Sequence, residues 1–104
     1  MRILFDQGTP RPLRRYLAGH EVKTSKEMLW SELENGELLK QAESAFEVFI
    51  TTDKNIRYQQ NLEGRRIGII VLPQPTWSVV RLHADKILQA VNSIRPGEYR
   101  ELTW

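Results

Sequence analysis

The chain has 104 residues, no cysteine, a formal net charge of +2 and a pI of about 9.2. This length suits one domain with its own core, and without cysteine the chain can form neither a disulfide framework nor a thiolate zinc site. The mildly basic balance is by itself weak evidence for a nucleic-acid partner.

The sequence is that expected of a protein that works away from membranes. It begins MRILFDQG, which lacks the apolar run of a signal peptide, and its longest apolar run, residues 67–72, is far too short to span a bilayer. We therefore expect a soluble, cytoplasmic protein made of a single domain, residues 1–104.

The first half of the chain alternates short apolar runs with helical patterns. The run RILF at residues 2–5 predicts a buried strand that ends at Asp6. Pro12 suits the first turn of a short helix that ends near Gly19. Three further elements are expected in this half: a strand over residues 20–24, a helix over residues 37–45 and a strand over residues 48–51.

The second half of the chain continues the alternation. The apolar run at residues 66–72 gives the clearest prediction of a buried strand, and Pro73 and Pro75 mark the loop expected after it. Residues 79–94 have the spacing of a long amphipathic helix, and residues 98–104 suit a last, edge strand. Strands that alternate with helices predict an α/β fold with a mostly parallel sheet of four or five strands between the helices.

Two of the expected strands lead into carboxylates. Asp6 directly follows the first strand, and Asp53 lies just beyond the third, in the stretch FEVFITTDKN. The carboxyl ends of parallel strands meet at one edge of a sheet, where open α/β sheets bind ligands, so the two acids converge if the strands are neighbours. Glu37, at the start of a helix, could join them, although an acid in a first helical turn is also ordinary.

Three carboxylates without cysteine or clustered histidine suit a hard cation such as Mg²⁺ or Mn²⁺. Such a cation can activate water and stabilise the leaving oxygen in phosphodiester hydrolysis. We therefore expect Asp6, Glu37 and Asp53 to be metal ligands and catalytic residues.

Positively charged and hydrogen-bonding side chains flank these acids in the sequence. They would let phosphates approach carboxylates that otherwise repel them. A solvated basic surface without a ligand is the alternative. The side chains expected to contact the substrate are Arg14, Thr51, Lys54, Arg57, Tyr58 and Gln60.

Three motifs together resemble a known family. ILFDQ in the first strand, NGELL at the helix start and VFITTDKN followed by YQQNL look like the small PIN-like proteins, the compact branch of the PIN-domain nuclease superfamily. The match covers residues 3–72. The resemblance implies a three-layer α/β/α fold, cleavage of single-stranded RNA, and Asp6, Glu37 and Asp53 as metal ligands, with Thr51 as the strand-end threonine of the site.

The same resemblance has implications for partners, because this branch includes the toxin ribonucleases of bacterial toxin–antitoxin pairs. It implies a cognate antitoxin protein and a homodimer. Two site positions depart from the family pattern. Asn55 stands where larger PIN domains often carry a fourth acid and can still ligate weakly or through water, and Gly8 stands where relatives commonly have Asn.

Two other functions remain open from the sequence. The first is a PIN-like module that binds RNA or a protein without cleaving it. The second, less favoured, is a receiver-like signalling domain, because receivers also have an Asp after strand one and another near position 53. Receivers normally carry paired acids after the first strand and a Lys-Pro after the fifth, and this sequence has neither.

Overall fold

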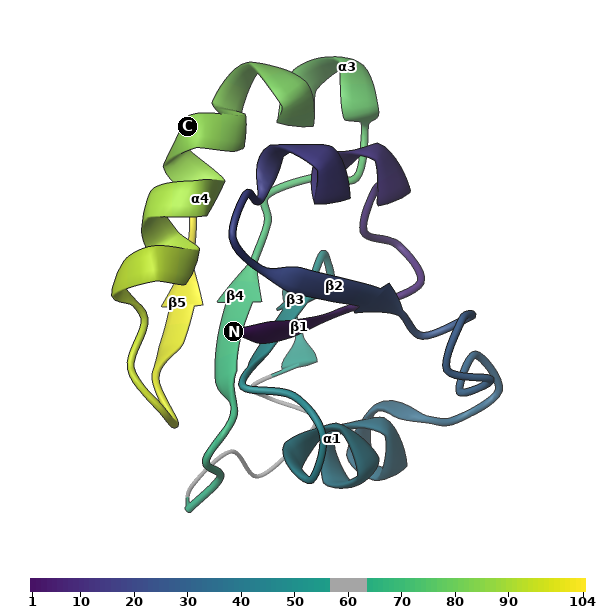
Figure 1. The fold of residues 1–104 in the computed structure, drawn as a ribbon. Coiled ribbons are helices and arrows are strands. Elements are labelled where there is room, and N and C mark those ends of the chain that lie inside the picture. The colour runs from purple at the N-terminus through teal and green to yellow at the C-terminus, as the bar shows by residue number, and fades with distance from the viewer. Residues whose placement is uncertain (57–63) are drawn as a thin grey trace.

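Five parallel strands form the centre of the molecule in the computed structural model, which describes residues 1–56 and 64–104 (Figure 1). The strands are β1 (Arg2–Phe5), β2 (Glu21–Thr24), β3 (Val48–Thr51), β4 (Gly68–Val71) and β5 (Tyr99–Glu101). Their order in the sheet is β2-β1-β3-β4-β5, and every neighbouring pair is parallel. The predicted α/β class with a mostly parallel sheet is confirmed, with five strands.

The helices lie to both sides of this sheet, with α1 apart from the others (Figure 1). They are η1 (Arg11–Tyr16), α1 (Asn35–Glu43), α3 (Trp77–Val80), η2 (Arg81–His83) and α4 (Ala84–Ser93). The single helix predicted for residues 79–94 is divided, because His83 leaves helical geometry at φ −116° and ψ 18°. In the described ranges, no helix is long and apolar enough to cross a membrane.

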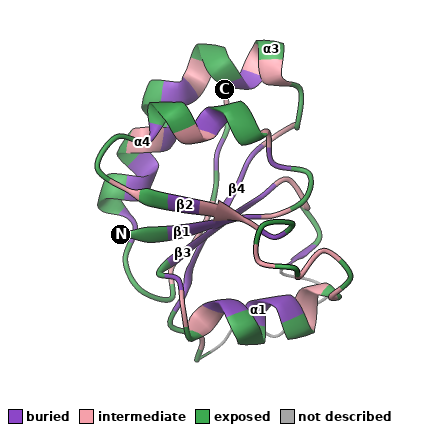
Figure 2. Ribbon diagram, turned by 45° about the vertical axis from the view of Figure 1, so that its right-hand side comes forward, coloured by how far each residue is buried: buried purple, intermediate pink, exposed green. Residues whose placement is uncertain are grey.

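Side chains that alternate along the strands build a core on each face of the sheet. Ile3 and Phe5 of β1 belong to a core shared with η1, α3 and α4, whereas Leu4 belongs to a second core shared with α1. Figure 2 shows β3 and β4 buried, β2 partly exposed, and α1 buried along only part of its surface. Burial on both faces explains why these strands read as nearly continuous apolar runs.

The parallel arrangement brings all the strand ends to two opposite edges. We call the loops that follow the five strands the carboxyl edge, and the segments that lead into them the amino edge. Phe5 pairs with Ile50, so Asp6 comes level with Thr51. The chain places β2 on one side of β1 and β3 on the other. Such a switch point, at the carboxyl edge between β1 and β3, is where open α/β sheets bind ligands.

Candidate functional site

The side chain of Thr51 joins the two acids that follow β1 and β3. Its hydroxyl donates to Asp6 Oδ2 at 2.8 Å and accepts from the backbone N–H of Asp53 at 3.0 Å. Thr51 is fully buried, so its hydroxyl is shielded from solvent and these two hydrogen bonds set the direction of the hydroxyl. The structure therefore connects the Asp6 carboxylate to the backbone of Asp53 through one oxygen atom.

The carboxylate of Asp53 is held by two donors of its own. Asn35, the first residue of α1, donates from Nδ2 to Asp53 Oδ2 at 2.9 Å. The backbone N–H of Asn55 donates to Asp53 Oδ1 at 3.0 Å. Asp6 is held in a similar way, because its Oδ1 accepts from the N–H of Gln7 at 2.8 Å. All these donors are neutral, so they orient the carboxylates without cancelling their charge.

The loops after β1 and β3 approach each other closely. A Cβ added to Gly8 would lie 2.6 Å from Thr52 Oγ1, so the absence of a side chain at Gly8 permits the contact. Thr9 strengthens it, because its hydroxyl donates to the carbonyl of Ile50 at 2.9 Å. Gly8, where the resembled family commonly has Asn, is therefore a position at which close packing of the two site loops favours glycine.

Glu37 is placed differently from the two aspartates. It is exposed on α1, and its carboxylate accepts from the side-chain amide of Gln41, one turn further along the same helix, at 3.0 Å. Among the described residues, no group of three or more His, Cys, Asp or Glu side chains could hold a metal ion. The structure connects Asp6 with Asp53, and the role of Glu37 as a third ligand stays a prediction.

Apart from Thr51, the predicted substrate residues fall into three groups. Lys54 is exposed beside Asp53 and lines a cavity of about 140 Å³ with residues at the ends of β4 and β5. Arg14 is committed to Glu27, whose carboxylate lies 2.8 Å away. The remaining three, Arg57, Tyr58 and Gln60, lie outside the described residues.

Two residues of this region were missed by the sequence analysis. The pair Asn35-Gly36 indicates a chain break before the helix, but a helix that precedes a parallel strand begins at that strand's carboxyl edge, and this rule could have identified Asn35. Glu27 lacks such a signal. Its pKa is lowered by the backbone N–H of Thr24 and then by Arg14, so the carboxylate stays ionised between two arginines, Arg14 and Arg11.

The donor set of the two aspartates fits a hard divalent cation. Each of the four carboxylate oxygens accepts one hydrogen bond within the described residues, and each can accept a second interaction. Within residues 1–56 and 64–104, neither Asp6 nor Asp53 forms an ion pair. Mg²⁺ is commonly held by one or two carboxylates together with water and substrate phosphate.

We compared the chain with models of protein families, with curated proteins and with solved structures, and found no match in any of the three.

Proposed function

We propose that the protein is a metal-dependent ribonuclease that cleaves single-stranded RNA, with Asp6 and Asp53 holding Mg²⁺ or Mn²⁺. The observation that carries the proposal is the pair of carboxylates tied to the buried Thr51 hydroxyl at the switch point of the sheet. The resemblance of the sequence to PIN-like proteins supports the same conclusion and supplies the RNA as substrate.

The residues around the two aspartates have distinct roles in this proposal. When bound, the cation supplies activation of water and stabilisation of the leaving oxygen. Thr51 fixes Asp6 relative to the backbone of Asp53, and Asn35 orients the Asp53 carboxylate. Lys54, exposed next to Asp53, attracts the phosphate backbone. Catalysis then depends on prior positioning of both acids.

The experiment is a cleavage assay on labelled single-stranded RNA in Mn²⁺, with EDTA as the metal-free arm. We expect wild type to cleave only with metal, and Asp6→Asn and Asp53→Asn each to lose at least about 100-fold in rate, the order seen when one group that stabilises a transition state electrostatically is removed. Asp85→Asn makes the same change on the exposed first turn of α4 and should keep wild-type activity.

Other outcomes of this assay discriminate between the remaining interpretations. Glu37→Gln tests the third predicted ligand, since a loss as large as that of Asp6→Asn assigns it to the site. If wild type binds RNA without cleaving it in any metal, the nuclease proposal fails and the RNA-binding module replaces it. Equal activity in Asp53→Asn and wild type would trace the cleavage to a contaminant.

The toxin role is a separate part of the proposal and is carried by the family resemblance. A toxin ribonuclease is held inactive by an antitoxin that covers its site. Coexpression with the neighbouring open reading frame should give a complex that copurifies and that suppresses RNA cleavage. Growth unaffected by the protein alone would count against this role.

One observation favours a second candidate, the receiver-like signalling domain. The order β2-β1-β3-β4-β5 is that of flavodoxin-like doubly wound folds, which include receivers. Asp6 and Asp53 then correspond to acids at the ends of β1 and β3. Incubation with acetyl phosphate separates the candidates, because a receiver forms an acyl phosphate on Asp53 that intact-mass measurement detects, whereas a nuclease does not.

A further inference from the structure

Two adjoining hollows lie beside Asp6 at the carboxyl edge. The first, of about 300 Å³, is formed by the loops after β1 and β2 and is lined by Asp6, Lys26 and Arg11 among others. The second, of about 350 Å³, is lined by residues of η1 alone, Arg11, Pro12, Arg14 and Arg15. Because Arg11 lines both, the hollow at Asp6 lies next to one lined by three arginines.

The second hollow, which we call the η1 hollow, carries an excess of positive charge. One carboxylate, Glu27, lies against its arginines, 2.8 Å from Arg14 and 3.7 Å from Arg11. Arg15 is exposed and has no ion-pair partner among residues 1–56 and 64–104. One acid against three arginines leaves a local charge of about +2, given that arginine is always protonated.

Glu27 also fixes the geometry of the hollow. Its carboxylate accepts from the backbone N–H of Thr24 at 2.9 Å and from Arg14 Nη1 at 2.8 Å, and the same Arg14 nitrogen lies 3.4 Å from the carbonyl of Val22. A guanidinium has five N–H donors in a rigid plane, so Arg14 keeps donors for a ligand. An arginine held in place before binding loses less side-chain freedom when a ligand arrives.

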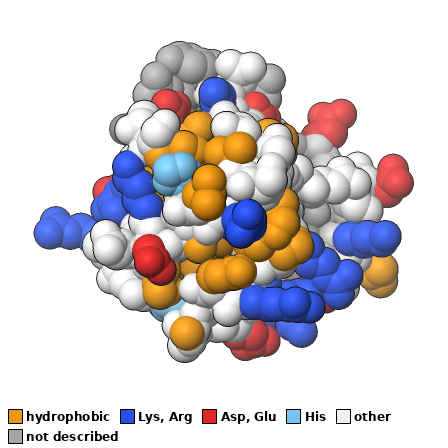
Figure 3. All heavy atoms as spheres, turned by 90° about the horizontal axis from the view of Figure 1, so that it is seen from above, with side chains coloured by type: hydrophobic (Ala, Val, Ile, Leu, Met, Phe, Trp, Pro, Cys, Tyr) orange, Lys and Arg blue, Asp and Glu red, His pale blue; other side chains and the backbone are white. Residues whose placement is uncertain are grey.

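The surface near the η1 hollow is also rich in positive charge. Figure 3, which looks down on the molecule from above, shows Lys and Arg side chains gathered beside an area of hydrophobic ones. Arg11 is 69% exposed as a side chain, which leaves most of its guanidinium open to a ligand. Planar guanidinium groups bind phosphate through paired hydrogen bonds, more specifically than an ammonium does.

We propose that the η1 hollow is a phosphate subsite for single-stranded RNA. Binding there would place the sugar-phosphate backbone of the RNA on the β2 side of Asp6. The inference rests on the proposed function for the identity of the ligand. An RNA strand, whose phosphates repeat regularly, can set one phosphate among the arginines while another part of its backbone lies near Asp6. Glu27 acts as a positioning residue, because it orients Arg14 rather than contacting RNA.

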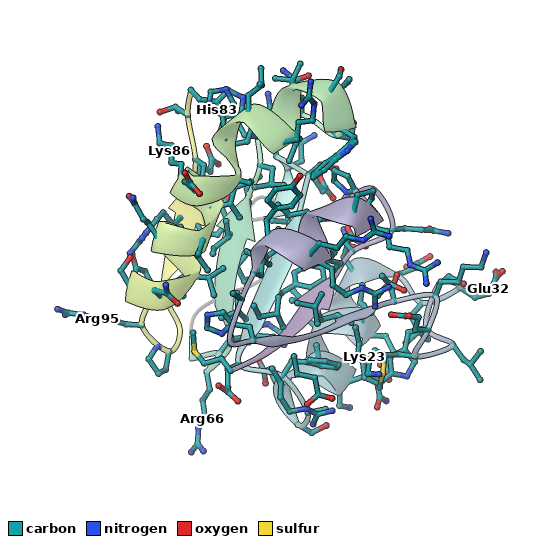
Figure 4. The ribbon with its side chains drawn as sticks, turned by 45° about the horizontal axis from the view of Figure 1, so that its top comes forward. Lys23, Glu32, Arg66, His83, Lys86 and Arg95 are labelled. Atoms are coloured by element: carbon teal, nitrogen blue, oxygen red, sulfur yellow. The ribbon has the colours of Figure 1, made fainter. Side chains whose placement is uncertain are left out.

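The amino edge offers a matched control for charge. Arg66 precedes β4 and Arg95 precedes β5, and both are exposed. Figure 4 shows the two side chains extending away from the body of the molecule. The double variant Arg66→Gln/Arg95→Gln removes the same charge as Arg11→Gln/Arg15→Gln, at the edge opposite the proposed subsite. A general effect of net charge would therefore act equally on both.

The test is fluorescence anisotropy of a short labelled single-stranded RNA in EDTA, titrated at several salt concentrations. We expect Arg11→Gln/Arg15→Gln to bind roughly 10-fold more weakly than wild type, with a slope of log K against log salt smaller by about 0.7 for each phosphate that the variant no longer neutralises. Arg66→Gln/Arg95→Gln should stay within about twofold of wild type. Circular dichroism and thermal denaturation check that both variants are folded.

The outcomes separate this inference from the nuclease proposal. Equal weakening in the two double variants, unchanged affinity in Arg11→Gln/Arg15→Gln, or no RNA binding by wild type would each overturn the subsite. Arginine-dependent binding without cleavage in Mn²⁺ would leave the subsite standing and remove the nuclease. Cleavage with an unchanged KM in Arg11→Gln/Arg15→Gln would keep the nuclease and remove the subsite.

Discussion

Two acids at the amino edge of the sheet pair with arginines, whereas at the carboxyl edge no ion pair among the described residues involves Asp6 or Asp53. Before β4, Arg65 lies 3.0 Å from Glu43, and at β5 Arg100 lies 2.8 Å from Glu98. These amino-edge carboxylates are neutralised within the fold. Their pairing accounts for their presence without any ligand.

At the carboxyl edge, Asp6 and Asp53 are bound only by neutral donors among the described residues. These donors are hydroxyl, amide and backbone N–H groups, which hold a carboxylate in position while its charge remains. Glu43 and Glu98 differ from Asp6 and Asp53 in this respect, because each has an arginine partner within the fold. Carboxylates held in place with their charge retained suit a bound cation, which is the proposal made for Asp6 and Asp53.

The largest effect is expected from Thr51→Val, which removes the hydroxyl between Asp6 and Asp53 and keeps the shape of the side chain. Both partners then lose a hydrogen bond in a buried setting, and the free energy of unfolding should fall by about 2 kcal/mol. Denaturation in urea measures the loss. Thr51→Ser retains the hydroxyl and should recover at least half of it. An unchanged stability in Thr51→Val would show that the connection contributes nothing.

A smaller effect is expected when an acid is added beside Asp53. Asn35→Asp replaces the amide donor that lies 2.9 Å from Asp53 Oδ2 with a carboxylate. Without metal, repulsion should cost about 1–2 kcal/mol at neutral pH. Because a third carboxylate attracts cations, Mn²⁺ should restore the stability and raise the melting temperature more than it does in wild type.

Gln41→Glu provides the control for Asn35→Asp. It adds the same charge to the same helix, but at an exposed position four residues from Glu37. A like-charge pair at that spacing costs only about 0.3 kcal/mol. Thermal denaturation with and without Mn²⁺ measures both variants. Equal responses of Asn35→Asp and Gln41→Glu to Mn²⁺ would contradict a cation site at Asp53.

Most of the sheet could be predicted from the sequence, because strands buried on both faces are marked by short apolar runs. The predicted runs that end at Phe5, Thr51 and Leu72 contain β1, β3 and β4, the last of which is shorter than its run and ends at Val71. The division of the 79–94 helix could not be predicted. The inward residues of that segment keep helical spacing, so the sequence pattern does not show a break. The break lies at His83, whose ring stacks on that of Trp104 with 4.5 Å between the ring centroids, and a contact between distant parts of the chain leaves no local pattern.

The site was predictable only where position in a strand determines position in space. Asp6 and Asp53 follow neighbouring parallel strands, so strand order alone brings their loops together. For Glu37 the sequence shows only that it is near a helix start. The helix begins two residues earlier, at Asn35, which reaches Asp53 instead. A shift of two positions on a helix turns a side chain by about half a turn.

The smallest effect concerns the acids that do pair with arginines. The pKa of Glu27 is lowered from its ordinary value of 4.5, first by the N–H of Thr24 and then by Arg14. Its contribution to stability is thus full above pH 4.5 and is lost as pH falls through the lowered pKa. The melting temperature of Glu27→Gln should lie slightly below that of wild type at neutral pH, and the two should converge in acid.

Glu98→Gln should follow the same trend, because the N–H of Arg95 and then the Arg100 side chain lower the pKa of Glu98. Melting temperatures measured from neutral pH down into acid test both variants. A difference from wild type that grows as the pH falls would contradict the assignment of these two carboxylates as ionised partners of arginine.

Thermal denaturation with and without Mn²⁺ tests whether the carboxylates of Asp6 and Asp53 hold a divalent cation. Wild type should melt at a higher temperature in Mn²⁺, because a cation that binds only the folded state stabilises it. Asp53→Asn should lose this shift, and Glu98→Gln, which removes an acid at the amino edge, should keep it. No shift in wild type, or an equal loss in both variants, would contradict the account.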